Sequence, residues 1–323
     1  MVRATIKGRE AWWVELRGGV TVAALLIALV LVLVSRDVGL PGQALLQSIR
    51  FHIVVLMLPL IVLLLLGRAW LRALAFTAIA GFSVYEGASI IMAQQALRST
   101  FAAAATKPLF TFISFNVLNG NSRGREIVDF LTASDADIVV TMESDPVYEN
   151  MEAMKAAYPY MSPCVDGICD LRLFSRVPLE DVQVRTVGSM WRNRFLLATA
   201  QIDGVRVTIA AAHLTKPYFD YEAAHEIEQI TQVLRSVEGP LLLAGDFNAA
   251  AWSADVSRMA RLSELAPGPS YPATWPVRSG PLGVPIDNVF ARGPLVIASV
   301  EAFADAMGSN HRGLKAEISV AGQ

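Results

Sequence analysis

Charged residues are scarce in this chain of 323 residues. They make up 17% of it, against 54% hydrophobic residues, a composition that is unusually apolar for a soluble protein. Cysteine is scarcer still: with only Cys164 and Cys169 present, a zinc site lacks a second pair of ligands. Basic residues are not in excess either. From residue 95 onward there are 19 Lys and Arg against 25 Asp and Glu, which disfavours nucleic-acid binding, because that function usually needs a basic surface.

Long apolar runs are present, and all of them lie in the first third of the chain. They cover Val20–Val34, Phe51–Leu66 and Trp70–Met92. About 20 apolar residues in a helix span a bilayer, so residues 1–94 are expected to form a membrane anchor of three transmembrane helices, at about 19–35, 51–67 and 70–93. A cleavable signal peptide resembles the first run, but the two further runs and the lack of a clear small-residue cleavage site disfavour it.

The basic residues beside these runs predict the orientation. The tail before the first run carries four Lys and Arg, and the short turn before the third run carries Arg68 and Arg72, whereas the longer first turn has only Arg36 and Arg50. By the positive-inside rule the N-terminus is cytoplasmic and everything after the third run lies outside. We therefore expect a multi-pass protein of a bacterial cytoplasmic membrane with a periplasmic or otherwise extracytoplasmic domain.

The two cysteines stand in the segment C-V-D-G-I-C, with a turn-forming Asp-Gly between them. In an oxidising exterior Cys164 and Cys169 are candidates for a small disulfide loop. Two free thiols at a chance spacing remain the alternative.

Residues 95–107 are expected to be a connector, either an extension of the third helix or a short stalk, and residues 108–323 a globular domain. In this domain short apolar runs typical of strands alternate with stretches of helical periodicity, the latter at 124–133, 150–157 and 219–237. The strand-like runs are at 110–117, 138–142, 171–174, 195–202, 205–212, 241–244, 287–290 and 316–320. Asp203-Gly204 predicts a hairpin turn between two strands. Hairpins interleaved with helices favour a mixed α/β sandwich over a regular parallel sheet.

Polar residues recur at the ends of the expected strands, where loops present side chains to a cleft. Any one of them has an ordinary structural interpretation, as a turn residue or a satisfied histidine. Together they form a set of seven: Asn116, Glu143, His213, Asp246, Asn248, Asp287 and His311.

The motifs around these residues are F-N-V, M-E-S, H-L-T, G-D-F-N, I-D-N-V-F and S-N-H-R. In this order they resemble the endonuclease/exonuclease/phosphatase superfamily over residues 108–320. The resemblance implies the DNase I-like fold, a four-layer α/β sandwich, and metal-assisted hydrolysis of a phosphate ester. Three spans before such a domain also resemble a membrane-anchored bacterial subgroup linked to lipid-pyrophosphate cleavage. Arg172 and Arg176, in L-R-L-F-S-R, are expected to be structural.

The resemblance also implies a metal site. Glu143 is the expected ligand of Mg²⁺ or Mn²⁺, because hard cations take carboxylate oxygens, and Asn116 would help to hold the metal or the phosphate. The family usually has Asp before the last histidine, where this chain has Asn310. An amide oxygen still coordinates a cation, so Asn310 is expected to be a neutral ligand that weakens any second metal.

The catalytic roles follow from the same resemblance. Asp246 would orient and deprotonate the attacking water, and Asn248 would hydrogen-bond the phosphate or the nucleophile. His213 and His311 would donate to the phosphoryl oxygens as charge builds up. Asp287 would accept from His311 and favour its protonated form.

The resulting hypothesis is a membrane-tethered, extracytoplasmic, metal-dependent phosphoesterase. Tethering raises the effective concentration of substrates in the membrane plane, so a phosphorylated lipid or envelope precursor is the expected substrate and the bilayer the expected partner; no protein partner is inferred. Two alternatives stay open. One is a nuclease of the same fold, which needs a local basic groove, and the other is an inactive envelope scaffold or binding module, for which Asn310 is the main indication.

Overall fold

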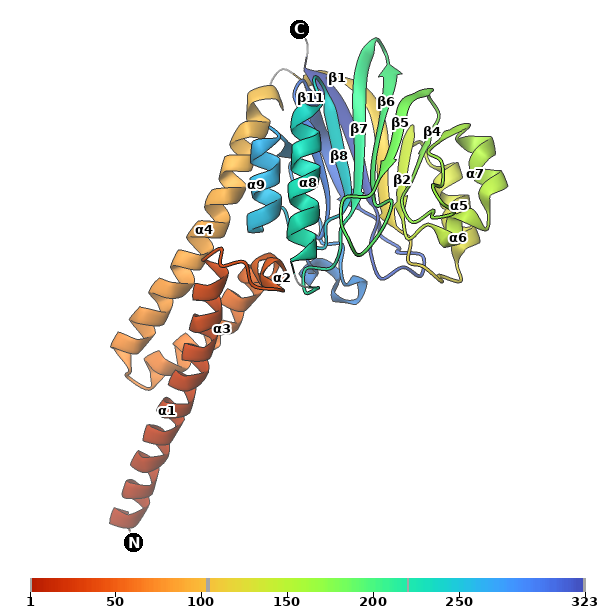
Figure 1. Cartoon of the computed structure of the whole chain (residues 1–323). Coiled ribbons are helices and arrows are strands. Elements are labelled where there is room, and N and C mark those ends of the chain that lie inside the picture. Colours follow the sequence, from red (N-terminus) through yellow and green to blue (C-terminus); the bar gives the residue numbers. More distant parts are fainter. Residues whose placement is uncertain (1, 103–104, 220, 322–323) are drawn as a thin grey trace.

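The computed structural model describes residues 2–102, 105–219 and 221–321. Its N-terminal part is helical: α1 (Val2–Val34), α2 (Gln43–Ser48), α3 (Arg50–Leu66) and α4 (Trp70–Ala102). Side chains of α1, α3 and α4 pack on one another in a separate apolar cluster. Helices α1 and α3 and the first part of α4 extend away from the rest of the molecule, whereas the last part of α4 lies beside it (Figure 1). Two of the expected three spans, Trp12–Val34 and Trp70–Ala102, are long and apolar enough to cross a membrane, whereas α3 is a shorter apolar helix.

The expected connector is largely a continuation of the third apolar helix. Helix α4 reaches Ala102, and the first strand, β1, begins at Ala105. Residues 103 and 104 lie outside the described residues. The helical alternative for residues 95–102 is therefore the one that the structure contains.

The remaining chain forms two six-stranded sheets. The first has the order β11-β12-β1-β2-β4-β3, from β11 (Leu295–Ala302), β12 (Leu314–Ala321), β1 (Ala105–Asn116), β2 (Ile138–Met142), β4 (Arg172–Ser175) and β3 (Tyr160–Met161). The second has the order β5-β6-β7-β8-β10-β9, from β5 (Leu179–Arg185), β6 (Phe195–Ile202), β7 (Val205–His213), β8 (Leu241–Asp246), β10 (Asp287–Arg292) and β9 (Ala266–Pro267).

Apolar side chains of both sheets meet in one large core, and helices cover the outer faces (Figure 1). The first sheet is covered by α5 (Gly124–Ala133), α6 (Asp145–Tyr148) and α7 (Met151–Ala157). The second is covered by α8 (Glu222–Ser236) and α9 (Ala254–Leu262), and η1 (Val277–Leu282) is a short 3₁₀ segment before β10. The layers are thus helix, sheet, sheet and helix, which is the expected α/β sandwich.

Local sequence accounts for several of these elements. Strand β2 is Ile-Val-Val-Thr-Met and is buried along its whole length, as a central strand covered on both faces requires. The turn at Asp203-Gly204 joins β6 to β7, with Ile202 paired to Val205 and positive φ at both turn residues. The predicted hairpin is confirmed, because a two-residue turn of this hand needs positive φ twice.

The apolar helices contact the sandwich directly behind the strand end that carries Asp246. The amide of Ala250 donates to Ser48 Oγ at 2.8 Å, and Trp252 Nε1 donates to the carbonyl of Gln47 at 3.1 Å. On α4, Gln94 Nε2 donates to the carbonyl of Ala251 at 2.8 Å. These contacts join the helices to the domain within a few residues of the G-D-F-N motif.

Candidate active site

Strand register brings most of the predicted residues to one edge of the sandwich. Strands β7 and β8 run parallel with His213 paired to Asp246, and β10 runs antiparallel to β8 with Asp287 paired to Asp246. In the other sheet Asn116, at the end of β1, pairs with Met142, one residue before Glu143. Because the two sheets face each other, their strand ends place both groups of polar residues around one point.

Asp246 lies at the centre of this group. Asn116 Nδ2 donates to Asp246 Oδ2 and to Glu143 Oε1, each at 3.1 Å. The Nε2 atoms of His213 and His311 lie 3.9 and 3.7 Å from Asp246 Oδ2. Two imidazoles, two carboxylates and one amide therefore converge on a space of a few ångströms, which is the arrangement expected for a site that binds and protonates an anion.

Glycine is needed directly before Asp246. Gly245 has φ of +143°, and a Cβ atom there would lie 1.8 Å from the carbonyl oxygen of Ala212 on the neighbouring strand. On the other side of Asp246, Asn248 has φ of +50°; its amide donates to Asp246 Oδ1 at 2.9 Å and its Nδ2 donates to the carbonyl of Leu214 at 2.8 Å. The G-D-F-N motif thus positions the central carboxylate from both sides.

His311 is paired with Asp287, as the sequence motifs implied. Its Nδ1 lies 2.9 Å from Asp287 Oδ2, and both side chains are buried. Burial by itself disfavours the imidazolium, but the Asp287 and Asp246 carboxylates outweigh it and raise the pKa of His311 to about 9. The segment is fixed to β1 through Ser309, whose hydroxyl donates to the carbonyl of Asn116 at 2.7 Å and accepts from the His311 amide at 3.0 Å.

The second histidine has a partner that sequence reasoning missed. Asp170 Oδ2 lies 2.6 Å from His213 Nδ1, and Asp170 Oδ1 accepts from Arg194 Nη2 at 3.0 Å. Burial would raise the pKa of Asp170, but His213 and Arg194 together hold it below its ordinary value. The position directly before an apolar strand was the available signal, yet nothing local indicates a partner 43 residues away in sequence.

The pKa of Asp246 shifts in the opposite direction to that of Asp170, because here burial outweighs the neighbouring histidines. Burial raises the pKa of this carboxyl above its ordinary value, the nearby Asp287 adds to the effect, and His311 opposes it. A carboxylate that is costly to keep ionised is a stronger base. Asp246 is therefore suited to take a proton from water.

The donor set also fits a hard cation. The side chain of Glu143 is 21% exposed, whereas those of Asp246 and Asp287 are 2% exposed, so of these three acids Glu143 is the one open to an entering ion. Asp246, Asp287 and His311 offer ligand atoms within 4.8 Å of one another, and a contact of 2.9 Å joins His311 Nδ1 to Asp287 Oδ2. Both Glu143 and the group of Asp246, Asp287 and His311 therefore offer oxygen or nitrogen donors to a divalent cation.

The two amides predicted as metal ligands lie differently. Asn116 faces the centre with its nitrogen, while its Oδ1 accepts from the Leu118 amide at 3.1 Å, so coordination through Oδ1 requires the amide to turn over. Asn310 is exposed. Among the described residues its hydrogen bond is through the backbone carbonyl, from the amide of Val277 at 3.3 Å, and no contact joins its side chain to Asp246.

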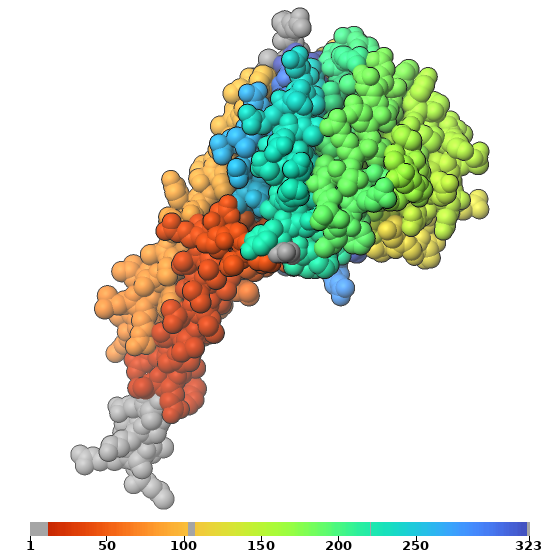
Figure 2. All heavy atoms as spheres, in the orientation of Figure 1, coloured from red at the N-terminus to blue at the C-terminus, as the bar shows by residue number. Residues whose placement is uncertain are grey.

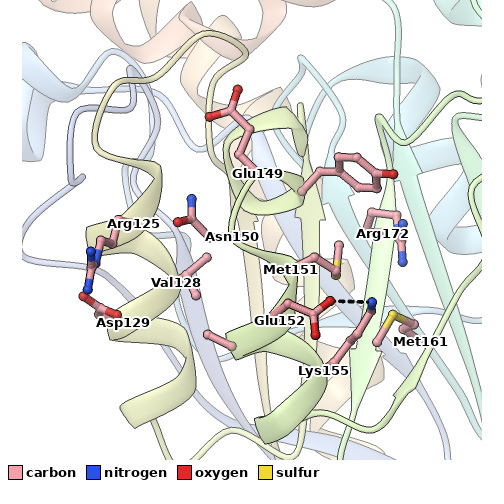
Figure 3. A pocket seen from close by; sticks show the side chains of 12 residues that line it. Arg125, Val128, Asp129, Glu149, Asn150, Met151, Glu152, Lys155, Met161 and Arg172 are labelled. Carbon is pink, nitrogen blue, oxygen red and sulfur yellow. Dashed lines mark hydrogen bonds and ion pairs between the residues drawn. The ribbon is translucent and has the colours of Figure 1, made fainter.

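Cys164 and Cys169 form a disulfide. Arg172 lies beside it: the guanidinium Nη1 donates to Cys164 Sγ at 2.6 Å and stacks over Phe174 at 5.4 Å. Arg172 also lines a cavity of about 740 Å³ beside α5, α6 and α7, where Lys155 pairs with Glu152 (Figure 3). No hydrogen bond or ion pair within the described part of the chain joins Arg172 to the carboxylate cluster.

Comparison with known proteins points to one family. The model of the endonuclease/exonuclease/phosphatase family matches residues 113–311, a range that contains Asn116 at one end and His311 at the other. No curated protein matches the sequence significantly.

Several solved structures have the same fold. A humanised form of the TDP2 protein of D. rerio has a TM-score of 0.56 at 19% identity, over 65% of this chain and 98% of that one. An endonuclease/exonuclease/phosphatase from Beutenbergia cavernae gives 0.53 at 18%, over 67% and 72%. Sphingomyelinase C from Streptomyces griseocarneus gives 0.50 at 18%, over 65% and 99%. At these identities the similarity shows the fold.

Proposed function

Because the chain belongs to the endonuclease/exonuclease/phosphatase family, we propose that it is a membrane-tethered, extracytoplasmic, metal-dependent hydrolase of a phosphorylated lipid or envelope precursor. The observation that carries the proposal is the buried Asp246, placed between two histidines that each have a carboxylate partner. Such a pair of oriented imidazoles beside a base suits hydrolysis of a phosphate ester or pyrophosphate.

Glu143 would hold Mg²⁺ or Mn²⁺, with Asn116 beside it, since oxygen donors are what these cations prefer. When bound, the cation supplies Lewis-acid polarisation of the phosphoryl oxygen. Asn116 Nδ2 bridges Glu143 and Asp246, and this contact keeps the metal-binding carboxylate next to the base.

The remaining steps belong to side chains of the chain itself. Asp246 accepts a proton from the water that attacks phosphorus, while the bond from phosphorus to the leaving oxygen breaks and that oxygen departs with the electron pair. The backbone amide of Asn248 holds the other oxygen of the Asp246 carboxylate in place. His311, protonated below pH about 9, donates to a phosphoryl oxygen and neutralises charge as it builds up. His213, held through Nδ1 by Asp170, presents Nε2 to the same space.

A lipid substrate is supported by where the site lies. The strand ends that carry the cluster belong to the edge of the sandwich from which the apolar helices extend, with α2 beneath the start of α8 (Figure 1). The acidic excess of the domain is a further argument against DNA, because phosphate backbones bind to basic surfaces. The positive-inside pattern of the flanking arginines supports an outer location.

The test is a substrate panel with the full-length protein in detergent micelles, with Mg²⁺ or Mn²⁺ added. The panel contains polyprenyl pyrophosphate, phospholipids, and single- and double-stranded DNA. Asp246→Asn removes the base, and Asp305→Asn, which changes an exposed carboxylate, is the matched control.

We expect turnover of a lipid phosphate that Asp246→Asn abolishes and Asp305→Asn leaves intact. Turnover of DNA alone would replace the lipid substrate with the nuclease alternative. If the wild type and Asp246→Asn are equally inactive on every ester, the result would favour the alternative of an inactive scaffold or binding module.

A further inference from the structure

Large apolar side chains remain exposed on loops that border the active site. They belong to the β5–β6 loop, the loop after β7 and the end of η1, and they are between 41% and 76% exposed. We call this set the interfacial rim: Met190, Trp191, Tyr218, Phe219 and Leu282. Isolated exposed apolar residues are ordinary, so what matters is whether these loops share a neighbour.

The first loop of the rim is connected to the catalytic histidine. The guanidinium of Arg194 lies over the Trp191 ring at 4.9 Å and pairs with Asp170, the partner of His213. The amide of Met190 donates to Glu222 Oε1 at 2.8 Å, which joins this loop to the first residue of α8.

The other two loops of the rim are also connected to active-site residues. Tyr218 and Phe219, whose rings lie 4.8 Å apart, follow His213 by only a few residues. The η1 segment is joined to the loop of His311, because the amide of Val277 donates to the carbonyl of Asn310 at 3.3 Å. All three rim loops therefore belong to the same edge as the carboxylate cluster.

Two of these loops contact the ends of the apolar helices that face the sandwich. The amide of Gly42, in the turn after α1, donates to the carbonyl of Pro217 at 2.7 Å. His52 Nε2, two residues after the start of α3, donates to the carbonyl of Leu282 at 2.9 Å. Figure 2 shows a segment with the colour of residues near 280 protruding at this lower edge of the domain.

If α1, α3 and α4 cross a bilayer, these two hydrogen bonds hold the loops that carry Tyr218, Phe219 and Leu282 at the level where the helices leave it. We propose that the interfacial rim lies in the headgroup layer of the outer leaflet, so that the active site receives a phosphorylated headgroup directly from the bilayer. This inference rests on the proposed membrane anchoring and deepens the proposed function. It names the lipid surface as the partner of the rim.

The chemistry of the rim matches that partner. Tryptophan and tyrosine prefer the interface between hydrocarbon and water, because their rings are apolar and their polar atoms stay hydrated. The same loops carry exposed cations, Lys216 and Arg278, which attract anionic headgroups. A contact with a second copy of the chain or with another protein would not require that the rim lie at the ends of the apolar helices, whereas a contact with the bilayer does.

The position of the rim is measured with a spin label on the full-length protein. Both cysteines of the chain are in the disulfide, so an introduced cysteine is the single free thiol. Phe219→Cys is compared with Phe130→Cys, a 40% exposed aromatic on α5, in vesicles of phosphatidylcholine and phosphatidylglycerol. Collision rates with oxygen, which concentrates in lipid, and with a water-soluble nickel chelate are recorded by electron paramagnetic resonance.

We expect the label at position 219 to favour oxygen and the label at position 130 to favour the nickel chelate. Water-like values at both positions would overturn the proposal. A label at 219 that is shielded from both reagents would also overturn it, because that result indicates a protein partner.

Activity gives a second, separate measure. The double variant Tyr218→Ser/Phe219→Ser is expected to lose at least about tenfold more turnover on a lipid phosphate in vesicles than on a short water-soluble phosphate ester, since interfacial binding scales with buried apolar area. Tyr218→Trp/Phe219→Trp is expected to restore the ratio. Equal losses on the two substrates would contradict an interfacial role.

The two experiments also separate this inference from the proposed function. If the wild type hydrolyses no phosphate ester, the proposed function fails, and the spin labels still decide where the rim lies.

Discussion

The pairing of His311 with Asp287 leads to a prediction about pH. Asp287→Asn removes a buried negative charge 2.9 Å from His311 Nδ1 and keeps the size of the side chain. A pKa of about 9, against the ordinary 6.5, corresponds to about 3 kcal/mol in favour of the imidazolium. Asp287 is the strongest of the neighbours that raise this pKa, and a single opposite charge at such a distance typically contributes 1–3 pH units.

We therefore expect Asp287→Asn to lower the pKa of His311 by about 1 to 2 pH units. His311 is protonated below its pKa and loses its proton as pH rises through it. The wild type should then lose kcat on a soluble phosphate ester above about pH 9, whereas the variant should lose it at a correspondingly lower pH.

The assay is a pH–rate profile joined to NMR of ¹³C-labelled imidazoles. The chain has four histidines, so the NMR signals of the imidazoles are few. The signal of His311 is assigned as the one that is missing from the spectrum of His311→Gln. Asp305→Asn, an exposed carboxylate, should leave the profile unchanged. If Asp287→Asn and the wild type lose activity at the same alkaline pH, His311 does not act as the proton donor proposed above.

Three further predictions follow from single residues. Asp170→Ala should lower kcat by about 100-fold with little change in KM, because His213 loses the contact that orients it; a matched fall in thermal stability instead would indicate a purely structural role. Gly245→Ala should destabilise the fold by roughly 3 kcal/mol or more, since its Cβ would meet the Ala212 carbonyl, and an unchanged melting temperature would refute this. Asn310→Asp should leave divalent-cation binding unchanged, because among the described residues the exposed side chain of Asn310 has no hydrogen bond to the cluster; tighter metal titration curves would place position 310 beside the metal.

Much of the fold was predictable because buried strands have a strong signature. The apolar run at Ile138–Met142 became β2 with the same bounds, and the amphipathic stretch Gly124–Ala133 became α5. The strands that the sequence did not reveal lie at or near the sheet edges. Strand β5 alternates exposed and half-buried residues, and β3 and β9 have two residues each, so neither burial nor length distinguishes them from loops. Strand β11 was missed as well, although it has eight residues and begins with the apolar Leu-Val-Ile.

The candidate site divides in the same way. Asn116, Glu143 and Asp246 could be selected from sequence because each follows an apolar run and stands in a recognisable motif. Asp170 could not be selected, because its role depends on His213 and Arg194 in another sheet. The interfacial rim could not be predicted from the sequence either, because exposed aromatic side chains indicate an interaction surface only when their neighbours in the fold are known.

By itself the sequence determined the family of the chain, the apolar segments that precede the domain, and the chemical type of most site residues. These are local properties, encoded in residue identity and in the spacing along one strand or helix. Tertiary structure alone decided which acid orients which histidine, that Cys164 meets Cys169, and that the active-site edge lies against the ends of the apolar helices. The histidine partners and the placement of the active-site edge depend on strand register and on contacts between segments far apart in sequence, which no local pattern encodes; for the cysteines, five residues apart, the sequence indicated a possible loop and the structure decided between a disulfide and free thiols.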